Sequence, residues 1–135
     1  MKFAYMDAVI HASLRVHPNT GLVLERVVPK EGTTIDGYAL PGGTIVGVNT
    51  WVIHRNKAIF GDDVDVFRPE RWLEASDERL IVMKRNLFSF GAGPRMCIGR
   101  NIAMMQIGKF MVEFYRNFNA TFTHPEEDWH VSGGW

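Results

Sequence analysis

Residues 22–53 contain clusters of β-branched residues separated by turn-forming residues. Because helical patterns lie on both sides of them, the chain must combine helices with strands. The clusters read GLVLERVVP and TTIDGYALPGGTIVGVNTWVI. Asp36-Gly37 and Gly42-Gly43 are dipeptides typical of hairpin turns, so we expect several short strands here. The expected fold class is therefore α+β, mainly α.

Two segments have helical periodicity. Residues 4–15 repeat apolar or small side chains without a breaker before Pro18, which predicts an amphipathic helix. A second helix is expected from about Ile98, because apolar residues recur there at three- and four-residue steps: Ala103, Ile107, Phe110, Met111, Phe114 and Phe118. The charged segment 56–85 between them predicts short helical turns and an ordered meander.

Composition limits the class of protein. The chain has 135 residues, of which 46% are hydrophobic, and this is enough for one globular domain. Its 15 basic and 15 acidic residues cancel, so overall charge does not point to nucleic acid or an anionic membrane. The longest uncharged run, residues 39–53, is too short to span a bilayer. We expect no membrane segment and no nucleic-acid partner.

Cys97 is the only cysteine, and it lies in a loop rich in glycine, GAGPRMCIG. The loop leads from the strand-like FSF segment into the second helix, so Cys97 should lie at or just before a helix N-terminus. Free N–H groups, the helix dipole and nearby Arg95 all favour a thiolate at this position. Three interpretations remain open from the residues alone: a buried structural thiol, a nucleophile, or a thiolate ligand of a metal or cofactor.

Other sequence motifs for cofactors and metals do not fit. A GxGxxG loop would need glycine where Met96 stands, and neither GxxxxGK[ST] nor HExxH occurs. His54, His124 and His130 are not spaced as a zinc set. Trp51 and His54 lie in strand-like sequence and are compatible with structural roles.

The cysteine loop resembles the haem-binding loop of cytochrome P450 enzymes. Five of its residues match the signature F-x-x-G-x-R-x-C-x-G: Phe90, Gly93, Arg95, Cys97 and Gly99. Upstream, the segment ASLR at residues 12–15 resembles the E-x-x-R helix of the family, and FRPERW at 67–72 resembles its P-E-R segment. The resemblance is to fungal, microsomal members and covers residues 1–135 as a single partial domain, the C-terminal haem-binding portion.

The resemblance assigns roles to individual residues. Cys97 would be the proximal ligand of the iron of haem b, where an anionic sulfur favours O–O cleavage. Phe90 would pack beside the sulfur. Arg95 would pair with a haem propionate, and Arg26 resembles a second propionate-binding position. Gly93 and Gly99 belong to the stretch that keeps the backbone clear of the porphyrin.

A charge cluster of the family is incomplete in this sequence. The family couples the glutamate of the E-x-x-R helix to its arginine and to the arginine of the P-E-R segment, here Arg15 and Arg71, but Ala12 replaces the glutamate. Leaving two like charges without that carboxylate costs on the order of 3–5 kcal/mol. Glu25, Glu70 or water are the alternatives that could compensate for it.

The resemblance implies a haem-thiolate monooxygenase, which inserts one oxygen atom of O₂ into a small organic substrate. Electrons would come from NADPH through a flavoprotein reductase. No segment resembles the oxygen-activating helix or the membrane anchor of the family, so we assign no catalytic residue and leave the localisation open, although such members usually reside in the endoplasmic-reticulum membrane. The alternatives are a truncated haem-binding module and a non-functional remnant, both without turnover, and we expect little activity from the isolated chain.

Overall fold

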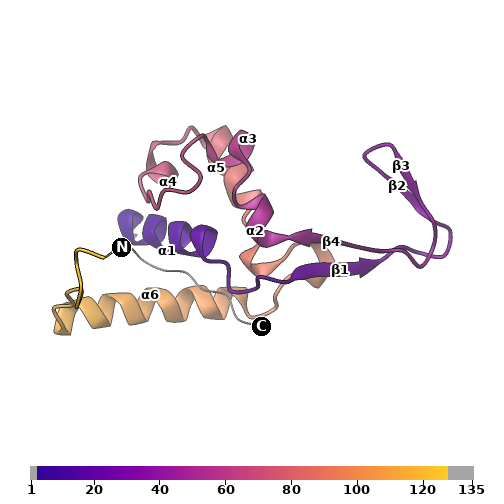
Figure 1. Cartoon of the computed structure of the whole chain (residues 1–135). Helices are drawn as coiled ribbons and strands as arrows, with labels where there is room; N and C mark the ends of the chain where they lie inside the picture. Colours follow the sequence, from indigo (N-terminus) through magenta and orange to yellow (C-terminus); the bar gives the residue numbers. More distant parts are fainter. Residues whose placement is uncertain (1–2, 128–135) are drawn as a thin grey trace.

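The computed structural model describes residues 3–127 and is built around the first helix. Helix α1 (Ala4–Val16) lies between the long helix α6 (Arg100–Asn117) on one side and a group of short helices on the other (Figure 1). These short helices are α3 (Lys57–Phe60), α4 (Arg71–Glu74) and α5 (Asp77–Arg85). The mixed fold class expected from the sequence is confirmed by structural neighbours described below.

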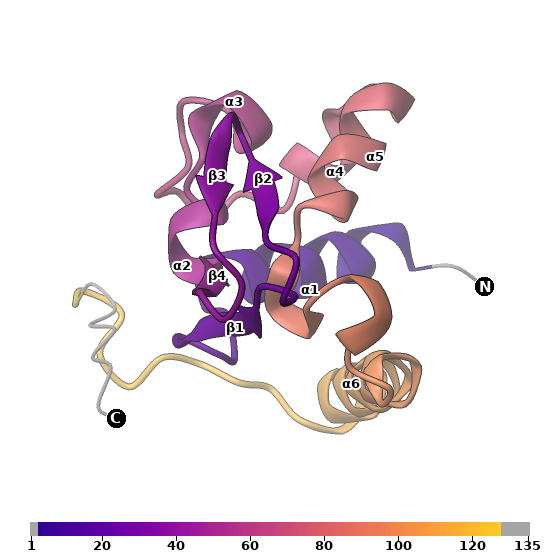
Figure 2. The same cartoon turned by 90° about the vertical axis from the view of Figure 1, so that its right-hand side faces the viewer.

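The strands form two separate antiparallel pairs. Strand β1 (Val23–Val27) pairs with β4 (Ile45–Asn49), and β2 (Thr33–Ile35) pairs with β3 (Tyr38–Leu40). Asp36 and Gly37 join β2 to β3 with φ of 50° and 82°, the left-handed backbone of the expected hairpin turn. This hairpin stands apart from α6 when the molecule is viewed along that helix (Figure 2).

The second glycine dipeptide has a different use. Gly42 and Gly43 connect β3 to β4, which do not pair with each other because β4 pairs with β1. Gly43 has a φ of 85°, and its N–H donates to the carbonyl of Val28 at 3.0 Å. The glycines therefore turn the chain from one sheet back to the other.

Two segments expected to be strand-like are helical. Trp51 belongs to α2 (Thr50–Ile53), and His54 ends it, because the Asn49 side chain accepts the N–H of Val52 at 3.2 Å and so begins a helical turn. The FSF segment forms the 3₁₀ helix η1 (Phe88–Phe90) rather than a strand, and a second 3₁₀ turn, η2 (Gly93–Arg95), follows. Helix α6 begins at Arg100, two residues later than expected.

The core lies between α1 and the segment 57–85. Its buried residues are Ala8, Ala12, Phe60, Val64, Trp72 and Met83. The two alanines leave one face of α1 nearly smooth, which lets α4 approach closely. In contrast, none of the 18 residues of α6 is buried: on its expected apolar face Phe110 and Phe118 are exposed, and the other four residues are half-buried.

Helix α6 is also the longest helix of residues 3–127. Neither it nor any other helix in that range is both long and apolar enough to cross a membrane.

Candidate functional site: the cysteine loop and the buried arginines

Cys97 lies between η2 and α6, three residues before the helix begins, and it is exposed. Its N–H donates to the carbonyl of Phe90 at 2.8 Å, and its own carbonyl accepts the N–H of Arg100 at 3.2 Å. These two bonds tie the cysteine to both ends of the loop. The exposure contradicts a buried structural thiol, because such a thiol would be packed against apolar side chains.

One open cavity of about 300 Å³ brings together four of the predicted site residues: Arg26, Phe90, Arg95 and Cys97. Arg26 comes from β1, far from the loop in sequence. Leu24, Phe88 and Gly91 also line this cavity, and a neighbouring cavity of about 580 Å³ shares Leu24, Arg26 and Phe88 with it. The site therefore combines a thiol, two guanidinium groups and apolar walls.

The predicted glycines have different surroundings. Gly93 has a φ of 66°, and a Cβ built on it would project into open space. Gly99 precedes α6, and a Cβ there would lie 3.8 Å from the sulfur of Cys97. Gly91, which the sequence did not single out, has a φ of 70° at the end of η1. The loop accordingly needs glycine for its backbone shape at positions 91 and 93.

The arginines of the site differ in their contacts. Arg26 donates to the neighbouring carbonyl of Glu25 at 2.6 Å. The Arg95 side chain is exposed and forms no hydrogen bond or ion pair with any other residue in the range 3–127. Both remain available to an acidic group placed in the cavity.

His54 anchors the start of the cysteine loop, although the sequence pointed only to a structural residue. Its side chain is fully buried, its Nε2 accepts the N–H of Phe88 at 2.8 Å, and its Nδ1 lies 3.1 Å from the carbonyl oxygen of Arg15. Burial, followed by the charges of Arg15 and Arg55, lowers the pKa of His54 to about 4. A second tether is close by, because Ser89 donates to the carbonyl of Leu14 at 2.7 Å.

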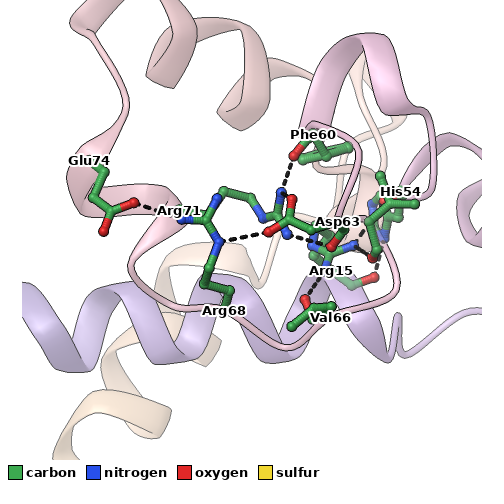
Figure 3. A network of polar contacts seen from close by, with 9 residues as sticks. Arg15, His54, Phe60, Asp63, Val66, Arg68, Arg71 and Glu74 are labelled. Carbon is green, nitrogen blue, oxygen red and sulfur yellow. Dashed lines mark hydrogen bonds and ion pairs between the residues drawn. The ribbon is translucent and has the colours of Figure 1, made fainter.

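Arg15 is buried, and its hydrogen-bond partners among residues 3–127 are all carbonyl groups. It donates to the carbonyls of His54 at 3.2 Å, Val64 at 2.5 Å and Val66 at 2.9 Å (Figure 3). Burial, followed by repulsion from Arg71 and Arg55, lowers the pKa of Arg15 to about 10. The two arginines of the predicted cluster are therefore close enough to repel each other.

Arg71 finds its carboxylate in Asp63, which the sequence analysis did not consider. Its guanidinium donates to the carboxylate of Asp63 at 2.5 Å, to the carbonyl of Asp63 at 2.8 Å and to the carbonyl of Phe60. Arg68 binds the other oxygen of Asp63 at 2.7 Å. The hydrogen bond from Arg71 is the main cause that holds the pKa of Asp63 below its usual value.

The two glutamates considered as substitutes are engaged elsewhere. Glu70 accepts the hydroxyl of Tyr5 at 2.6 Å, and Glu25 is exposed on β1. The sequence signal for Asp63 is its position between Gly61 and the P-E-R segment. Asp62 and Asp65 lie in the same stretch, so this signal alone does not single out Asp63. Only the folded chain distinguishes among them.

The histidines named in the sequence analysis lie in different surroundings. His54 is buried between α1 and η1, and His124 is exposed. His130 lies outside the described residues.

Comparisons with known proteins define the class. The sequence model of the cytochrome P450 family matches residues 1–134, so the chain belongs to this family. It is 47% identical over 131 residues to a pisatin demethylase of Fusarium vanettenii, covering 97% of this chain and 25% of that protein. It is 40% identical over 131 residues to a cytochrome P450 monooxygenase of Emericella nidulans, covering 97% of this chain and 26% of the relative.

Solved structures similar to this chain are also cytochromes P450. A zebrafish cytochrome P450 solved with progesterone matches with a TM-score of 0.68 at 31% identity, over 82% of this chain and 23% of that one. A cyanobacterial P450 with bound retinoic acid has a TM-score of 0.67 at 23% identity, over 82% of this chain and 25% of that one, and supports the fold alone. The chain thus spans about a quarter of the length of these relatives. The family is one of haem-containing oxidoreductases, and relatives of this chain are named as monooxygenases.

Proposed function

We propose that the chain provides the proximal half of a haem-thiolate site, with Cys97 as the iron ligand. The observation that carries this proposal is the exposed Cys97 sulfur in one cavity with Phe90 and the two arginines Arg26 and Arg95. A nucleophile would need a histidine base within reach, and no hydrogen bond or ion pair joins a histidine to Cys97 among residues 3–127.

The residues present fit a haem group. A soft thiolate suits iron, and its position just before α6 places it near the free N–H groups of the helix. Arg26 and Arg95 would bind the two propionates, because a guanidinium matches a carboxylate in charge and geometry. Gly93 presents no side chain toward the open space beside the loop.

Each residue would have a defined task when haem is bound. With a thiolate ligand, haem supplies the activation of O₂ that monooxygenation requires. Phe90 would limit the access of water to the sulfur, and the hydrogen bonds of His54 and Ser89 would hold the loop on α1. We assign no catalytic acid or base to this chain.

For the protein as a whole we propose a monooxygenase acting on a small organic substrate. Electrons would come from NADPH through a flavoprotein reductase, as in the family. Within it, residues 1–135 would act as one partial domain that binds haem. The incomplete charge cluster at Ala12 favours weak haem retention and little turnover by this chain alone.

The test is a spectrum of the chain expressed with haem, reduced and then exposed to carbon monoxide. We expect the red-shifted Soret band of a thiolate-ligated ferrous complex, and we expect Cys97→Ser to lose it while keeping the same circular dichroism spectrum. A haem complex whose Soret band is identical in Cys97→Ser would overturn the ligand assignment. If the band is present, NADPH consumption with a reductase then tests turnover separately.

A further inference from the structure

Three buried N–H groups in the core have no hydrogen-bond acceptor among residues 3–127. They are Nε of Arg15, Nε of Arg71 and the indole Nε1 of Trp72. The three residues are 1%, 4% and 5% exposed. Buried donors are nearly always paired in folded proteins, and an exception points to a water molecule or ion at the site.

The three donors belong to one place in the fold, because all three side chains meet Phe60. The Arg15 guanidinium lies 5.8 Å from the centre of the Phe60 ring, and the Trp72 ring centre lies 6.2 Å from it. Arg71 donates to the Phe60 carbonyl. Ala12 joins the same buried cluster from α1, one turn before Arg15 on the same helix face.

Positive charge exceeds negative charge at this place. In the described range 3–127, Arg15 donates to three carbonyl groups and forms no hydrogen bond with a carboxylate. Asp63 and Asp65 are the carboxylates whose charges act on Arg15. Asp63 is already bound by both Arg71 and Arg68, and Asp65 pairs with Arg55 at 3.4 Å. A water molecule would satisfy the donors but would leave the charge of Arg15 uncompensated in a buried setting.

We propose that these donors form a binding site for a small carboxylate anion. A carboxylate has two oxygens that accept several N–H groups at once, and its hydrogen bonds to guanidinium are strengthened by charge. Ala12 presents only a methyl group one turn before Arg15, so the smallest carboxylate, formate, is the probe that we choose. The site needs no haem and is separate from the cysteine cavity.

The structure also offers a route from solvent. Arg71 and Phe60 line an open cavity of about 310 Å³, together with Met83 from the core and the exposed Arg79. Arg79 forms no side-chain hydrogen bond or ion pair with the rest of the described chain, so its charge is free to attract an anion. Glu74 also lines this cavity, but it is bound to Arg68 at 2.6 Å.

The experiment measures thermal unfolding of the full chain in sodium formate, against sodium chloride of equal ionic strength. Formate at ten times its Kd should raise the Tm by about 4 °C, and the effect should saturate. Two variants are matched in shape and differ in charge: Ala12→Glu supplies the carboxylate from the chain, and Ala12→Gln supplies a neutral amide. We expect Ala12→Glu to have a higher Tm without formate and to lose the response, whereas Ala12→Gln should gain less stability than Ala12→Glu.

A direct binding measurement does not depend on the variants. The ¹³C signal of labelled formate should broaden in the presence of the wild-type chain and sharpen again when excess acetate competes. Absence of broadening would mean that water satisfies the three donors, and the proposal would be overturned. The proposal would also be overturned if the rise in Tm with formate does not saturate. The same holds if chloride produces an equal rise, or if the rise persists in Ala12→Glu.

Discussion

Arg15 and His54 bind each other twice, each through its side chain to the backbone of the other. Nη1 of Arg15 donates to the carbonyl of His54 at 3.2 Å, and Nδ1 of His54 lies 3.1 Å from the carbonyl oxygen of Arg15. Because Nε2 of His54 accepts the N–H of Phe88, the proton of the neutral ring must be on Nδ1, which donates to Arg15. The pair joins α1 to the first residue of η1, and thus to the cysteine loop.

This pair predicts an acid-sensitive fold. The pKa of His54 is about 4 in the folded chain against an ordinary 6.5, so the unfolded chain binds the extra proton between these values. Stability from His54 is therefore fully present above about pH 6.5 and is lost as the pH falls toward 4, by about 3 kcal/mol in total. Urea denaturation from pH 4 to 7.5 measures how steeply the free energy of unfolding changes with pH. His54→Gln should flatten this dependence, whereas the same change at exposed His17 should not; an unchanged slope in His54→Gln would contradict the assignment.

Arg71 and Arg68 share Asp63 but differ in burial, which predicts unequal effects of the same substitution. The Arg71 side chain is 4% exposed and the Arg68 side chain is 38% exposed. Lysine cannot reproduce the three hydrogen bonds of Arg71, so Arg71→Lys should lower the free energy of unfolding by about 3 kcal/mol. Arg68→Lys should lower it by less than about 1 kcal/mol. Equal losses in denaturant titrations would show that burial does not set the strength of these pairs.

Two glycines should respond to alanine in opposite directions. Gly61 has a φ of 95°, and a Cβ there would lie 3.3 Å from both Arg71 Nη1 and Asp63 Oδ1. Gly61→Ala should therefore cost about 1–3 kcal/mol of stability. Gly108 lies inside α6, where a Cβ would meet only the end of Met6 at 3.9 Å, so Gly108→Ala should stabilise the chain by up to about 1 kcal/mol. Thermal unfolding of the two variants measures both changes in stability. A loss of stability in Gly108→Ala would contradict the prediction.

Met83 is the buried residue that helix α5 contributes to the core, and Leu80 packs against the core while partly buried. Met83 is 1% exposed, and Ile81 on the same helix is 66% exposed. Met83→Ala should destabilise the chain by about 2–5 kcal/mol, because it removes buried apolar surface and leaves a cavity. Ile81→Ala removes a mostly exposed side chain from the same helix and should change stability by no more than about 0.5 kcal/mol. A similar effect of both substitutions in urea denaturation would mean that α5 does not pack as described.

Arg95 provides a prediction for cofactor retention that rests on the proposed function. If its free guanidinium binds a propionate, Arg95→Gln should weaken haem binding by about tenfold, near the strength of one charge-assisted hydrogen bond. The rate of haem transfer to apomyoglobin measures the effect. Arg85→Gln is the matched control, because Arg85 ends α5 and does not line the cysteine cavity. Equal transfer rates for the two variants would remove Arg95 from the proposed site.

The sequence alone determined the local features of this protein. Helix α1, the β2–β3 hairpin and the glycine backbone of the cysteine loop follow from periodicity and turn chemistry, which act over a few neighbouring residues. Cys97 and its signature likewise stand within one short segment. The predictions for segments with an ambiguous local pattern were wrong. The FSF segment and the segment at Trp51 resemble strands in sequence, but caps and nearby packing make them helical.

Only the tertiary structure decided which distant groups meet. The partners Arg15 and His54 are 39 residues apart, and Ser89 and Leu14 are 75 residues apart. No periodicity reports such pairs, because they depend on how α1 packs against the segment 57–85. The choice of Asp63 as the carboxylate for Arg71 depends on the same packing, and so does the lack of a carboxylate hydrogen-bonded to Arg15 among residues 3–127. Burial makes these choices costly to reverse, and burial is a property of the assembled core.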